Sequence, residues 1–217
     1  MRDTAENLIH QLAGDLQPVK RLPHPAKRLL FWLLLALPVS LALGALIEHQ
    51  NMALALDRIK NPRVLLELLA ILLTAATAGY AALSSAQPGR NENVWVLPVV
   101  PFLLWLSFVS ETCWQLFNQV GPDQFSFAPH WVCYPAVVAT GFAPALVLAI
   151  FLRQGLLRSP SKSVALAVLA ASALGAIGLR LFHPPDATVL LLMWQLIATV
   201  TFMLMGSLGA KYWQNRA

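Results

Sequence analysis

Two cysteines and two histidines have the most distinctive chemistry in this 217-residue chain. Cys113 and Cys133 lie near the two ends of residues 111–131, a stretch without Lys or Arg. His130 comes just before the second cysteine, and His183 follows a later apolar segment, at the same expected membrane level. In an oxidising compartment two thiols can form a disulfide. Thiolate and imidazole groups together bind soft or borderline metal ions.

The sequence leaves three interpretations of this group open. Cys113 and Cys133 could pair as a disulfide. One or both could instead bind a metal ion together with His130 and His183, most simply through Cys133. The third interpretation is that both cysteines are free and pack as small apolar side chains. No paired Cys-x-x-Cys spacing, which would favour a metal site, is present.

Six apolar stretches must position these residues. They cover residues 29–47, 64–83, 94–110, 132–152, 164–182 and 187–208. Each is close to the length of about 20 residues that a helix needs to cross a hydrocarbon core roughly 30 Å thick. The runs are continuous rather than alternating, which favours helices over a barrel. We therefore predict an all-α membrane protein, a compact bundle of six transmembrane helices over residues 27–217, after a short amphipathic segment over residues 1–26.

Composition and charge support this class and indicate an orientation. The chain is 58% hydrophobic and 12% charged, whereas soluble domains carry about 25% charged residues. With the N-terminus inside, eleven of the fifteen Lys and Arg fall in cytoplasmic segments and four in outer ones. Since basic residues favour the cytoplasmic side, both termini are predicted there. The net charge of +5 then reports orientation, and no nucleic-acid partner is expected.

The N-terminal segment has the features of a short amphipathic helix. Asp3 and Glu6 have the spacing of a capping box, and Pro18 ends the pattern. The apolar residues of one face are Leu8, Ile9, Leu12 and Leu16. This helix could lie on the membrane surface or dock a cytoplasmic protein. The acidic residues of the segment disfavour an anionic lipid surface.

Packing signals and ionisable residues complete the pattern. Small residues recur every fourth position in three spans, which predicts close helix contacts; they are Ala36, Ser40 and Gly44, then Ala70, Thr74 and Ala78, then Ala167, Ala171 and Gly175. Glu67 lies about one turn into the second span, close enough to the outer surface to snorkel or to pair with Arg63, and a structural role is expected for it. No chain of ionisable residues crosses the bilayer, and no catalytic or cofactor motif is present. We therefore expect no enzyme and no cofactor; a small six-span transporter or channel is the main alternative.

Three segments, in this order and spacing, resemble the negative regulator of sigma F family, six-span anti-sigma factors of the bacterial inner membrane. They are LIHQLAGDLQPVKR at residues 8–21, WVC at 131–133 with FLRQG at 151–155, and GAIGLRLFH at 175–183 with later matches at 185–186 and 193–194. The resemblance covers nearly the whole chain. It departs from the family at His183-Pro184, where the family has His-Cys, so that Cys113 is the only other cysteine to take that place.

The resemblance implies a membrane anchor that sequesters an extracytoplasmic-function sigma factor and releases it on an envelope, metal or oxidative signal. The sigma factor would bind the N-terminal segment through Leu8, Ile9, Leu12, Asp15, Leu16, Pro18 and Val19. The signal would be received on the outer face by Cys113, Cys133, His130 and His183.

Overall fold

The computed structural model describes residues 22–47, 52–87, 92–120, 133–155, 159–182 and 197–209, together with positions 7, 14, 49 and 89. Its elements are α2 (Pro25–Ile47), α3 (Met52–Ile59), α4 (Pro62–Ser85), the 3₁₀ turn η2 (Glu92–Val96), α5 (Val99–Val120), α6 (Cys133–Arg153) and α7 (Pro160–Phe182). A further apolar helix covers Ile197–Gly209. All regular secondary structure in the described residues is helical, which confirms the predicted all-α fold class.

Five of the helices are long and apolar enough to cross a membrane. They correspond to the first five predicted spans, and the helix at Ile197–Gly209 lies at the end of the sixth. One boundary was wrong: the third predicted span ends at residue 110, but residues 111–120 continue α5. Their polar side chains find partners on the helix, as when Thr112 donates to the Phe108 carbonyl (2.9 Å), and Gly121-Pro122 is the first strong breaker.

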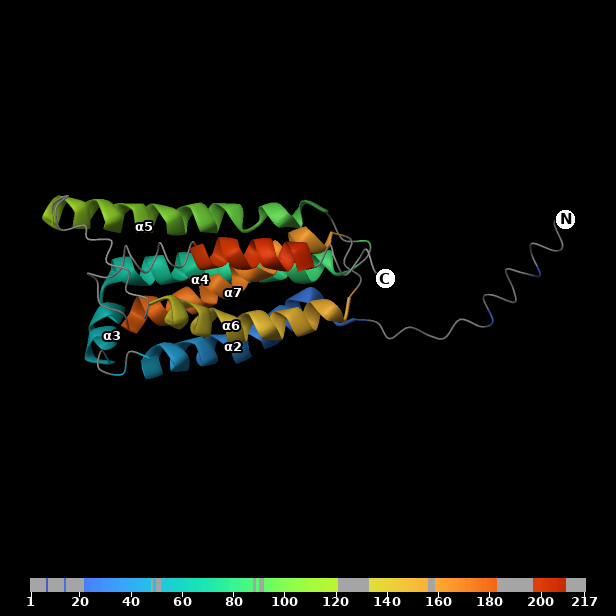
Figure 1. Cartoon of the computed structure of the whole chain (residues 1–217), viewed down its shortest axis with the longest axis horizontal. Helices are drawn as coiled ribbons and strands as arrows, with labels where there is room; N and C mark the ends of the chain where they lie inside the picture. Colours follow the sequence, from blue (N-terminus) through green and yellow to red (C-terminus); the bar gives the residue numbers. More distant parts are fainter. Residues whose placement is uncertain are drawn as a thin grey trace.

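The helices form a layered bundle around α7 (Figure 1). α7 packs against α4 on one side and against α6 and α2 on the other. α5 is outermost and packs on α4, and the short α3 crosses one end of the bundle against α7 and α4. The sequence did not predict α3, whose buried side chains are Ala55 and Arg58, one turn apart on one face.

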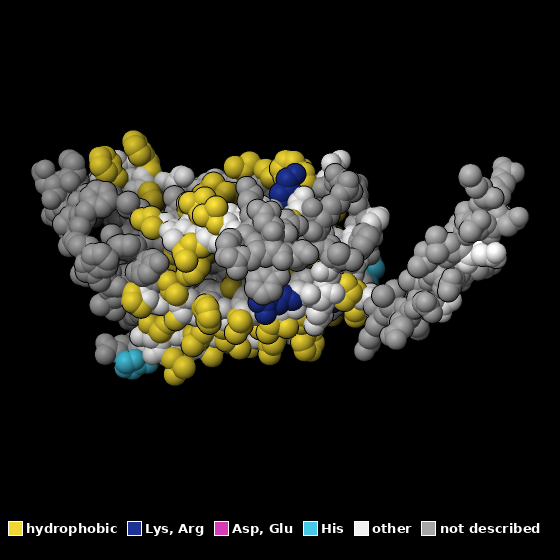
Figure 2. Space-filling model, turned by 45° about the vertical axis from the view of Figure 1, so that its right-hand side comes forward, with side chains coloured by type: hydrophobic (Ala, Val, Ile, Leu, Met, Phe, Trp, Pro, Cys, Tyr) yellow, Lys and Arg dark blue, Asp and Glu magenta, His cyan; other side chains and the backbone are white. Residues whose placement is uncertain are grey.

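Many small residues lie in the interior beside a few large ones such as Trp32 and Leu174, and many large apolar residues face outward, as expected when lipid rather than water is the solvent. All nine residues of the three predicted stripes are buried. Outside, Leu34 is 67% exposed, and hydrophobic side chains cover much of the described surface in Figure 2. The predicted close helix contacts are therefore confirmed.

The backbones of α2 and α7 approach each other closely at two glycines. A Cβ atom at Gly44 would lie 2.8 Å from the Gly178 carbonyl carbon, and a Cβ atom at Gly178 would overlap the Ser40 carbonyl oxygen. Only glycine fits at these two positions, because a side chain would have to push the two backbones apart.

We predict that Gly178→Ala lowers the unfolding free energy of the bundle by about 1–3 kcal/mol, because it overpacks the α2–α7 contact. The measurement is the thermal unfolding midpoint in detergent. Gly209→Ala is the matched control: nothing lies within 4 Å of a Cβ atom there, and Ala favours a helix over Gly. Equal midpoints for the two variants would contradict the prediction.

Candidate functional site

Each end of the bundle has its own set of charged residues. We call the end where α2 begins the Lys27 end; its described basic residues are Lys27, Arg28, Arg153 and Lys162. We call the opposite end the Glu67 end; its described charged residues are Asp57, Arg58, Lys60, Arg63, Glu67, Glu111 and Arg180. Of the predicted sensing residues, Cys113 and the backbone of Cys133 lie at the Glu67 end, and the predicted partner-binding segment precedes α2 in the chain.

A buried ion pair joins α4 to α7 at the Glu67 end. Arg180 donates from Nε to Glu67 Oε1 (2.7 Å) and from Nη2 to Glu67 Oε2 (2.9 Å). The side chains are 14% and 4% exposed, respectively. Two parallel charge-assisted hydrogen bonds fix the direction as well as the strength of the contact. The pair therefore sets the register between the two most buried helices.

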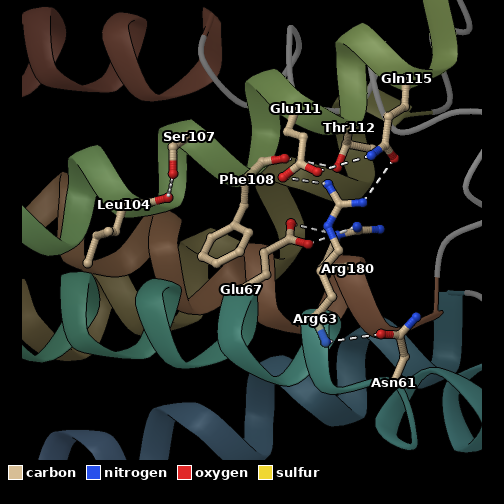
Figure 3. A network of polar contacts seen from close by, with 10 residues as sticks. All are labelled: Asn61, Arg63, Glu67, Leu104, Ser107, Phe108, Glu111, Thr112, Gln115 and Arg180. Carbon is tan, nitrogen blue, oxygen red and sulfur yellow. Dashed lines mark hydrogen bonds and ion pairs between the residues drawn. The ribbon is translucent and has the colours of Figure 1, made fainter.

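Two more arginines connect helices near this ion pair. They are Arg58 on α3 and Arg63 on α4, and Figure 3 shows the contacts of Arg63. Arg58 on α3 donates from Nη1 to the Arg180 carbonyl, one of the free carbonyls in the last turn of α7. The Nη2 atom of Arg63, on α4, lies 3.1 Å from Oε2 of Glu111, and its Nη1 atom donates to Oε1 of Gln115 (2.9 Å). Both partners are on α5. The polar network thus connects α3, α4, α5 and α7.

Neither placement that the sequence left open for Glu67 is found, because the side chain is buried and its partner is not Arg63. Arg63 reaches outward to α5, while Arg180 approaches Glu67 from α7 (Figure 3). The i,i−4 spacing made Arg63 available, but a partner on the packed helix gives a buried bidentate contact. The sequence signal that could have identified this partner is the expected depth in the membrane. Glu67 lies soon after the start of α4 and Arg180 lies just before the end of α7, so both are near the same end of the bundle.

Cys113 is the one predicted sensing residue whose side chain the structure describes. It is a free, partly buried cysteine on α5. Helical spacing puts its thiol on the other side of α5 from Glu111 and Gln115, so it lies beside the polar network without belonging to it. Cys133 is the first residue of α6, where only its backbone is described. His130 and His183 lie outside the described residues.

The packing separates the helices that carry the two cysteines. α5 packs on α4, whereas α6 packs on α7 and α2 (Figure 1). Among the side chains described, no three His, Cys, Asp or Glu residues are grouped closely enough to hold a metal ion. The side chains of three of the four proposed ligands, Cys133, His130 and His183, are not among those described, so the sensing set stays a prediction.

The partner-binding residues predicted in the N-terminal segment also lie outside the described residues; they are Leu8, Ile9, Leu12, Asp15, Leu16, Pro18 and Val19. The structure does fix where that segment leaves the bundle. Gln87, just after α4, donates from Nε2 to the Pro23 carbonyl (2.9 Å). The chain before α2 is therefore anchored to α4 at the Lys27 end.

Comparison with known proteins decides the family. The model of the family described as negative regulator of sigma F (NrsF) matches residues 12–214, nearly the whole chain. The chain belongs to the NrsF family. No curated protein and no solved structure matches it.

Membership of the NrsF family confirms the resemblance and gives the chain its role. It is a negative regulator of a sigma factor, and a sigma factor is its partner. The family match begins at Leu12, so it includes part of the N-terminal segment as well as the helices.

Proposed function

We propose that this NrsF-family chain is a membrane-bound anti-sigma factor of the bacterial inner membrane. Its cytoplasmic N-terminal segment, residues 1–26, holds an extracytoplasmic-function sigma factor away from RNA polymerase. An envelope, metal or oxidative signal at the Glu67 end releases it. The observation that carries this proposal is the family match from residue 12 to residue 214 over a bundle of long apolar helices.

The charge distribution supports a cytoplasmic Lys27 end. Basic residues favour the cytoplasmic side. The arginines at the Glu67 end make contacts that hold helices together. Arg180 pairs with Glu67, and Arg63 pairs with Glu111. Arg58 bonds to the end of α7. Their presence at the Glu67 end therefore follows from helix packing and does not oppose this orientation.

The N-terminal segment supplies the surface for the sigma factor. Its apolar face would enter a groove on the partner, as amphipathic helices do. Pro18 and the prolines at 23 and 25 separate this face from α2. The Gln87–Pro23 bond holds the base of the segment at the membrane surface. A sigma factor bound there would be kept at the membrane.

Helices α4 and α7 provide a route between the two ends. The buried ion pair joins them at the Glu67 end, and Ser85 and Ser163 hydrogen-bond at 2.6 Å at the Lys27 end. α4 then continues to Gln87, which contacts Pro23. We propose that a signal shifts α4 and α7 together and moves the base of the N-terminal segment, a change between two packed arrangements.

Removing the N-terminal segment should abolish sigma-factor control. A chain lacking residues 2–21 keeps every described helix but loses the proposed binding surface. We expect transcription from a sigma-dependent promoter to rise to the level seen without the anti-sigma factor. The measurement is reporter activity, with membrane levels of the two chains matched by quantitative blotting. Full repression by the truncated chain would contradict the proposal.

Replacing Cys133 by Ser tests the proposed sensor. If its thiol receives the signal, Cys133→Ser represses normally without stress but no longer responds to oxidant or metal. The measurement is reporter induction of Cys133→Ser against the wild type. Cys113→Ser, tested beside it, separates the two proposed mechanisms: a disulfide requires both thiols, so both variants would lose the response, whereas a site built on Cys133 alone leaves Cys113→Ser inducible. Unchanged induction in both variants would remove the cysteines from the mechanism.

A further inference from the structure

Arg28 carries a buried positive charge for which the described part of the chain supplies no counter-ion. The residue is 5% exposed, in the first turns of α2. Its Nη2 atom donates to the Phe151 carbonyl and, at 3.5 Å, to Gln154 Oε1, both uncharged acceptors on and after α6. Its Nη1 atom has no hydrogen-bond partner among the residues described. Buried charges are normally paired, because removing them from water is costly.

A cavity of about 240 Å³ lies beside this guanidinium. Its wall is formed by Pro23, Lys27, Arg28, Phe31, Phe151 and Gln154. Among the described residues that line it, two are positively charged and none is acidic. The cavity is between the beginning of α2 and the end of α6, at the Lys27 end of the bundle. Basic pockets between transmembrane helices at this level bind the headgroups of anionic lipids.

The surface next to the cavity is apolar. Leu30 and Phe31 are each 59% exposed, and Leu34 continues this face one turn further along α2. On the face drawn in Figure 2, the visible Lys and Arg side chains lie in the half nearer the beginning of α2, above and among hydrophobic side chains. A ligand that fits must be anionic at one end and apolar along the other.

We propose that this cavity binds the headgroup of an anionic phospholipid. The phosphate would lie between Lys27 and Arg28, and one acyl chain would follow Phe31 and Leu34 along α2. An acidic side chain of a protein partner could supply the charge, but it would leave the apolar face of α2 uncovered. The proposal requires only that the helices lie in a bilayer, so it does not depend on sigma-factor binding.

Native mass spectrometry of the detergent-purified full chain tests this site. Phosphatidylglycerol, phosphatidylcholine and glycerol 3-phosphate are titrated separately into the wild type, Lys27→Gln and Arg28→Gln. Arg153→Gln is the control, since Arg153 is exposed at the same end and does not line the cavity. We expect phosphatidylglycerol to bind the wild type selectively. One lost charge should weaken that binding about fivefold in Lys27→Gln and leave Arg153→Gln within about twofold of the wild type.

Three results would overturn the proposal. They are equal retention of phosphatidylcholine and phosphatidylglycerol, unchanged phosphatidylglycerol binding in Lys27→Gln, and binding of glycerol 3-phosphate as tight as that of the lipid. Arg28 also bonds to Phe151, so Arg28→Gln could unfold the bundle. Lys27 is exposed, and its variant decides the question in that case.

Discussion

Glu67→Gln is expected to lower the unfolding free energy of the bundle by about 3–5 kcal/mol, because it leaves the Arg180 guanidinium buried without its carboxylate. Gln can accept one hydrogen bond from Arg180 but cannot balance its charge in an apolar interior. Arg180→Gln should cost a similar amount for the converse reason. The measurement is the unfolding free energy in mixed micelles, followed by circular dichroism.

The exposed ion pair of the same network provides the control. Glu111 is 54% exposed and pairs with Arg63 at 3.1 Å, so Glu111→Gln should cost no more than about 1 kcal/mol. The double variant Glu67→Gln with Arg180→Gln should cost less than the sum of the single variants, because no charge is then left unpaired. Equal losses for Glu67→Gln and Glu111→Gln would show that the buried pair does not hold α4 to α7.

Placing charges on the apolar face of the N-terminal segment should abolish sigma-factor binding. In Leu12→Asp with Leu16→Asp, two leucines that the proposed complex buries become carboxylates. Each buried Leu contributes about 1.5–3 kcal/mol, so the affinity should fall at least about 100-fold. The measurement is titration of the purified sigma factor against the full chain in detergent.

A charge on the opposite face of that helix is the matched control. Gln17→Asp adds one carboxylate about half a turn away from Leu12 and should change the affinity by less than about threefold, as expected of a surface charge at moderate salt. If Gln17→Asp weakened binding as much as the double leucine variant, general charge rather than the apolar face would be responsible.

The sequence predicted the bundle well because its signals are local. An apolar run of about twenty residues is a property of one helix, and Ala36, Ser40 and Gly44 lie four apart along one face. The structure buries all three residues, with Ser40 and Gly44 against Gly178 of α7. What the pattern could not give was which helix lies opposite, since nothing in residues 36–44 specifies α7 as the neighbour.

The parts that sequence reasoning missed depend on contacts between distant segments. Arg180 is far from Glu67 along the chain, so only the nearer Arg63 was considered as a partner for Glu67. Arg28 looked like one more basic residue of the cytoplasmic flank, yet it is buried against α6. α3 lies in a short connection between α2 and α4, and Arg58 on it bonds to the Arg180 carbonyl of the distant α7. Such contacts follow from helix packing and membrane depth, not from spacing.

Co-purification of the sigma factor tests the central claim most directly. The full chain and the chain lacking residues 2–21 are extracted from membranes in the same detergent at matched levels, and the retained sigma factor is quantified. If the N-terminal segment is the surface that holds the partner, the full chain retains the sigma factor and the truncated chain retains none. Retention of the sigma factor by the truncated chain at the level of the full chain would contradict the account.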